Sequence, residues 1–161
     1  MSVETGAAAS IHAHELTRIL AAFRVETPAA AIPPAALESG RQLVLDTIGV
    51  SLLASTHRVG TLISTHSAEL GGHHPRASVF GRSGLRVTPL FAAQANGVMA
   101  NALDYDGGAH LPTRILPAVL AVAEELGASG RDALAAFVIG CEASFEAFEP
   151  LEPSGKIVDV N

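Results

Sequence analysis

The sequence predicts an all-α fold of about six helices with one short extended segment. Apolar residues make up 48% of the 161 residues and aromatic residues only 4%, which favours helices packed through small side chains. Apolar residues also recur at helical spacing in several segments, and glycine or proline interrupts the chain between them. At this length one well-buried domain is expected.

The first two helices are expected at residues 11–25 and 35–54, on either side of a proline-containing connection. The second segment is apolar almost all round, so we expect it at the centre of the core. Asp46 is the exception in this segment. A buried carboxylate needs an ion pair or hydrogen bonds, so the sequence predicts a structural partner for Asp46.

The middle of the chain carries the signals for two more helices and for the extended segment. A helix at residues 60–70 is expected to stop at Gly71-Gly72, and residues 77–81 form the β-prone segment. Thr88 is placed to cap a helix at residues 89–103. Within that helix Asn96 and Asn101 are polar residues that need partners.

The last two helices are expected at residues 115–126 and from the Ser129 cap to about Phe148. Gly127 ends the first, and Ser129 with Asp132 matches a capping box for the second. Helices joined by so few residues should pack antiparallel. Residues 1–148 therefore form one helical domain, and the tail at 149–161 is either disordered or bound to a partner.

Composition excludes several classes of partner. The net charge is −6, and no run of Lys or Arg could neutralise a phosphate backbone, so nucleic acid is not expected. No apolar run approaches the ~20 residues needed to span a bilayer, and residues 1–15 do not resemble a secretory signal. The single cysteine, Cys141, excludes an intrachain disulfide and is expected to be a small buried apolar residue. These features predict a cytoplasmic protein.

The low charge density adds two expectations. Only 16% of residues are charged, which suggests that another chain or subunit covers part of the surface. Lys156 is the sole lysine, so recognition of an anionic group must rest on arginine, histidine or helix amino termini.

Polar residues gather between the helices expected at 89–103 and 115–126. Asp104, Asp106 and His110 fall within seven residues there, where side chains can reach the edge of a core. An aspartate- and glycine-containing link often only caps the next helix and faces water, and that alternative stays open. Gly107-Gly108 lacks the lysine and the strand context of a phosphate-binding loop, and no ligand set for a metal is seen, so neither cofactor nor metal is expected.

Four segments, in order, resemble the MmgE/PrpD family of dehydratases and decarboxylases. They are LVLDTIGVSLLAS at 43–55, SVFG at 78–81, AAQANGVMANALDYD at 92–106 and LPAVLAVAEELGASGRDALAAFVIGCE at 116–142. The resemblance implies the first part of the family's helical domain and a cofactor-independent lyase acting on a polycarboxylate or related acid.

The resemblance assigns roles within the polar link. It implies that His110 is the acid/base and that Asp104 orients it or acts as a base, with Asp106 and Asn101 contacting substrate. Arg114 could clamp a substrate carboxylate or pair with Asp106.

The chain also departs from the family pattern. Gly107 stands where a third acid is usual, and His110 alone stands where the family has two histidines. Family members are much longer. One hypothesis is therefore that the chain is one part of a split or oligomeric lyase, which further copies or a second chain carrying the missing domains would complete. The alternative is a noncatalytic helical remnant that serves oligomerisation or binds a small acid.

Overall fold

The computed structural model describes residues 15, 17–72, 74–105 and 110–148, and these are mainly helical. The prediction of an all-α fold is confirmed. The tail predicted at 149–161 lies outside the described residues. The helical elements are residues 17–26, η1 (Ala29–Ala31), α2 (Pro34–Ser55), α3 (Arg58–Leu70), α4 (Pro89–Asn101), α5 (Leu111–Leu126) and α6 (Gly130–Phe148).

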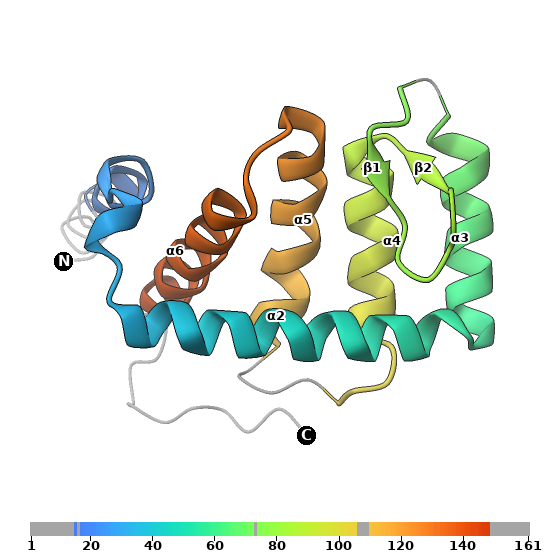
Figure 1. Cartoon of the computed structure of the whole chain (residues 1–161), viewed down its shortest axis with the longest axis horizontal. Helices are drawn as coiled ribbons and strands as arrows, with labels where there is room; N and C mark the ends of the chain where they lie inside the picture. Colours follow the sequence, from blue (N-terminus) through green and yellow to red (C-terminus); the bar gives the residue numbers. More distant parts are fainter. Residues whose placement is uncertain (1–14, 16, 73, 106–109, 149–161) are drawn as a thin grey trace, which may run out of the picture.

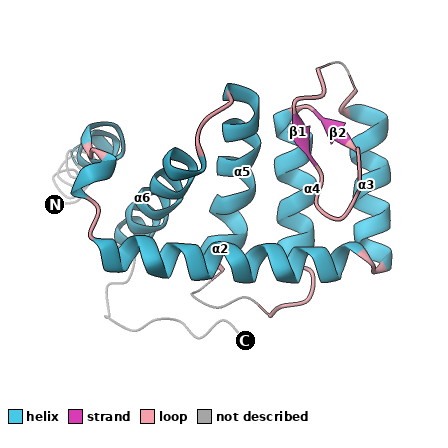
Figure 2. Cartoon of the chain, viewed as in Figure 1, coloured by secondary structure: helices cyan, strands magenta, loops and turns pink. Residues whose placement is uncertain are grey.

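The longest helix, α2, runs along one edge of the molecule and the other labelled helices rise from it (Figure 1). Helices α3, α4, α5 and α6 stand side by side in that order, each in contact with its neighbour and with α2. A two-stranded antiparallel sheet, β1 (Ala77–Ser78) and β2 (Arg86–Val87), lies against α3 and α4 (Figure 2). The sequence predicted β1, within the segment at 77–81, but did not predict β2.

Helix α2 buries its small and polar residues and exposes leucines. The hydroxyl groups of Thr47, Ser51 and Ser55 are buried, and each donates to a carbonyl of the preceding turn of α2. On the outer side Leu45 is 74% exposed, and Leu52 and Leu53 are about half exposed. The expectation that α2 is buried on all sides is therefore wrong, because the other helices cover only one of its faces.

The prediction for Asp46 fails for the same reason. Asp46 lies on the uncovered part of α2 and is exposed to solvent. A solvated carboxylate does not need a buried partner.

Helix α5 begins four residues earlier than predicted. The expected start was at 115, but Pro112 lies in the first turn of α5, where proline is tolerated because the N–H has no helical acceptor. Pro117 then lies inside the helix. The capping box of α6 is confirmed: Ser129 Oγ donates to Asp132 Oδ2 at 2.7 Å and accepts from the Asp132 N–H.

At the start of α4 the predicted side-chain cap is not formed. Thr88 occupies the cap position, but its side chain makes no capping hydrogen bond. Its backbone serves instead, since the Thr88 N–H donates to the Gly71 carbonyl at 2.9 Å and the Thr88 carbonyl accepts from Ala92.

Asn96 joins α4 to the extended segment, as its need for partners predicted. Its side chain is buried, Nδ2 donates to the Ser78 carbonyl at 2.9 Å, and Oδ1 accepts from the Phe80 N–H at 2.8 Å. One amide thus satisfies two backbone groups that have no strand on that side.

We expect Asn96→Ala to lower the free energy of unfolding by about 2–4 kcal/mol, because it leaves two part-buried backbone groups without partners. Urea unfolding followed by circular dichroism measures this. Gln94→Ala, on an exposed position of the same helix, should change it by under about 0.5 kcal/mol. Equal effects of the two substitutions would contradict this account of Asn96.

Candidate functional site

The link between α4 and α5 brings His110 close to Asp104. His110 Nε2 lies 3.7 Å from Asp104 Oδ1, so the two side chains form an ion pair when the imidazole is protonated. The side chains are 40% and 83% exposed respectively, so the pair stands at the surface. Both residues have left-handed backbones, with φ of 55° at Asp104 and 60° at His110.

Local hydrogen bonds hold this geometry. The Asp104 N–H donates to the Asn101 carbonyl at the end of α4, at 3.3 Å. At the start of α5, Thr113 Oγ1 donates to the His110 carbonyl at 2.9 Å. Asp106, predicted to contact substrate, lies outside the described residues.

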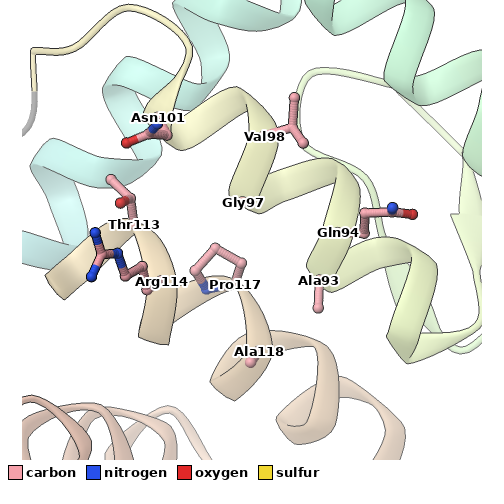
Figure 3. A pocket seen from close by; sticks show the side chains of 9 residues that line it. All are labelled: Ala93, Gln94, Gly97, Val98, Asn101, Thr113, Arg114, Pro117 and Ala118. Atoms are coloured by element: carbon pink, nitrogen blue, oxygen red, sulfur yellow. The ribbon is translucent and has the colours of Figure 1, made fainter. Parts of the chain in front are cut away.

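Asn101 and Arg114 line an open groove of about 490 Å³ between α4 and α5 (Figure 3). Asn101, Thr113 and Arg114 lie together at one end, and Ala93 and Gln94 lie at the other. The Asp104 N–H is hydrogen-bonded to the Asn101 carbonyl, and the His110 carbonyl to the Thr113 hydroxyl. The histidine–aspartate pair therefore adjoins the polar end of the groove.

The groove includes residues that the sequence analysis did not single out. Gly97 on α4 and Thr113 and Pro117 on α5 form facing parts of its walls. A proline four residues after Thr113 inside an otherwise helical segment was the available signal, since it marks a carbonyl that loses its helical donor.

Other features of the described part of the chain give weaker indications of function. No group of three His, Cys, Asp or Glu residues there is placed to hold a metal ion. Nor is any helix in that part long and apolar enough to cross a membrane. Burial, with a smaller contribution from Glu142, raises the pKa of the half-buried Cys141 thiol from 9.0 to about 11.

The MmgE/PrpD N-terminal domain matches residues 18–157. The chain belongs to the MmgE/PrpD family. It is also similar to the cis-aconitate decarboxylases of Homo sapiens, at 32% identity, and Mus musculus, at 30%, each over 114 residues and 66% of this chain. These matches span only 24% and 23% of the two relatives, so the chain corresponds to about a quarter of their length.

Cys141 should be a poor nucleophile in the folded protein. With its pKa at about 11, the thiolate fraction at pH 8 is about 100-fold lower than at the ordinary value, and alkylation by iodoacetamide should slow to match. Mass spectrometry of alkylation in buffer and in urea compares the folded and unfolded thiol. Alkylation as fast in buffer as in urea would show that burial does not suppress the thiolate.

Proposed function

We propose that this chain is the first helical part of a MmgE/PrpD-type lyase that acts on a polycarboxylate or related acid without a cofactor. The observation that carries the proposal is the His110–Asp104 pair, 3.7 Å apart, beside a groove that displays the guanidinium of Arg114. An acid/base group and a carboxylate-binding group are the two components that such a reaction needs on one surface.

The proposed chemistry uses His110 as the proton carrier. In a dehydration, a base removes the proton next to the carboxylate, and an acid protonates the departing hydroxyl, which leaves as water. In a decarboxylation, carbon dioxide leaves and an acid protonates the resulting carbanion. Histidine is a common general acid and base and serves either step, while Asp104 orients the imidazole. Arg114 and Asn101 hold the substrate at the groove.

A second polypeptide or further copies of this chain complete the enzyme in this proposal. One observation supports that part: the outer face of α2 presents Leu45, Leu52 and Leu53 to solvent. Such a leucine face is typical of a surface that another protein segment covers.

The noncatalytic alternative rests on a separate observation. The two acid/base side chains are 40% and 83% exposed, and an exposed pair gains little from the low dielectric constant of a closed active site. In that alternative the groove binds a small acid, or α2 mediates oligomerisation, without turnover.

One experiment separates the two. The chain is purified alone and together with the product of any adjacent reading frame, and native mass is measured with turnover of hydroxy and unsaturated mono- and polycarboxylates. Turnover in the mixed complex or in a homo-oligomer supports the lyase. A stable assembly without turnover of any of these acids rejects it in favour of the noncatalytic role.

We expect His110→Asn to lower turnover by at least about 100-fold, because it removes the acid/base group. Asparagine tolerates the left-handed backbone at this position, whereas His110→Ala would add strain and confuse stability with chemistry. The melting temperature should therefore stay nearly unchanged. His57→Asn is the control, since His57 is exposed at the corresponding cap position of α3. Full turnover in His110→Asn, or equal loss in His57→Asn, would reassign His110 to structure.

The leucine face of α2 gives a second prediction. In light scattering at micromolar concentration the chain should have a mass above the 16.5 kDa of one copy, and Leu45→Glu should lower that mass. Leu90→Glu is a matched control, because Leu90 on α4 is also 74% exposed but lies away from this face. A wild-type chain that is monomeric alone and with its candidate partner would refute the prediction.

A further inference from the structure

Two glycines inside helices of this chain are explained by the close approach of another helix. A Cβ on Gly40 of α2 would lie 2.6 Å from a methyl group of Val138 on α6, and a Cβ on Gly140 of α6 would lie 2.9 Å from Ile115 on α5. Glycine weakens a helix interior relative to alanine. At both positions close packing against the neighbouring helix accounts for the glycine.

Gly49, near the middle of α2, has no such neighbour. It is exposed, and nothing lies within 4 Å of the point where its Cβ would stand. It lies on the outer leucine face of α2, four residues after Leu45 and four residues before Leu53. Neither a turn nor a contact within the described chain requires glycine there. A close approach from outside the chain would give this glycine the same reason as the other two.

The leucine face around Gly49 is complementary to itself. Residues four apart lie on the same side of a helix, about one turn from each other. A two-fold axis between two copies of Gly49 brings Leu45 of each copy against Leu53 of the other, with the glycines facing at the centre. Facing glycines allow the helix axes to approach to about 8 Å, the close end of helix packing. This self-complementarity is what a symmetric dimer interface needs.

The charges along α2 favour the antiparallel orientation. Its charged residues are Glu38, Arg41 and Asp46, two acids and one base, and all three precede Gly49. Arg58 opens α3 directly after α2 and is exposed. Antiparallel pairing brings Arg58 of each copy toward the acidic half of the other copy, whereas parallel pairing brings like charges together.

We propose that two copies of this chain pair through α2, with the two helices antiparallel and in close contact at Gly49. The pairing covers Leu45 and Leu53 and gives the exposed glycine a packing role. It does not depend on the lyase chemistry, because the His110–Asp104 pair lies in the link between α4 and α5.

The test is disulfide cross-linking of the full chain in a Cys141→Ala background, in which the introduced thiol is the sole one. Gly49→Cys should form covalent dimers, because axes about 8 Å apart bring facing Cα atoms within the ~7 Å that a disulfide spans. Leu45→Cys should cross-link to Leu53→Cys but not to itself, since its own two copies lie about 12 Å apart along the axis. Leu90→Cys, equally exposed on α4, controls for random collision and should react at least about ten-fold more slowly than Gly49→Cys.

A larger side chain at the centre distinguishes this contact from nonspecific association of an apolar surface. Gly49→Leu should raise the dissociation constant of the dimer at least about ten-fold in sedimentation equilibrium, because it forces the helix axes apart. On a nonspecific apolar surface the added leucine would strengthen association instead. Gln94→Leu adds the same side chain to an exposed position of α4 and should leave the dissociation constant unchanged. Circular dichroism checks that each variant keeps its helical content.

Three outcomes would overturn the proposal. They are a wild-type chain that sediments as a monomer, association of Gly49→Leu at least as tight as that of the wild type, and self-cross-linking of Leu45→Cys as fast as its cross-linking to Leu53→Cys. A face that associates only with a second polypeptide would also overturn it and assign α2 to that partner. None of these results bears on turnover, so the proposed lyase could survive them. Conversely, a cross-linked dimer without turnover in any assembly would reject the lyase alone.

Discussion

The position of the hairpin depends on the buried amide of Asn96. Because this amide pairs with backbone groups of Ser78 and Phe80, it fixes the extended segment against α4, the helix that contacts α2, α3, α5 and both strands. With the segment fixed, Arg82 reaches the corner between α2 and α3. Its guanidinium donates to the Ser55 carbonyl and to the hydroxyls of Thr61 and Ser64. One satisfied amide therefore sets the register between a hairpin and three helices.

Helix α2 shows why its composition alone could not place it. Its inner face is made of Thr47, Ser51, Ser55 and small residues, whose hydroxyls bond within the helix and so tolerate close contact with four other helices. Its leucines lie outside that contact. An apolar sequence on all sides predicts coverage on all sides, and the described chain supplies coverage on only one. The difference is the physical basis for expecting a partner over Leu45.

What the sequence predicted correctly was encoded locally. The glycine stop after α3 and the Ser129–Asp132 capping box need only neighbouring residues, and the helix boundaries there came out close to prediction. The approach of His110 to Asp104 also followed from their short separation in the chain, although their roles remain predictions. The exposure of Asp46 could not be read in this way, because it depends on which distant segments lie against α2.

The groove combines two residues that a stable helix would avoid. Glycine in α4 and proline in α5 each weaken their own helix, the first through backbone entropy and the second through a lost hydrogen bond. Glycine at 97 is not required by packing, since alanine there would meet its neighbours at ordinary contact distance. Pro117 differs, because its ring is fully buried. Packing therefore gives a reason for the proline and none for the glycine, and the two weakened helices meet at the wall of the groove.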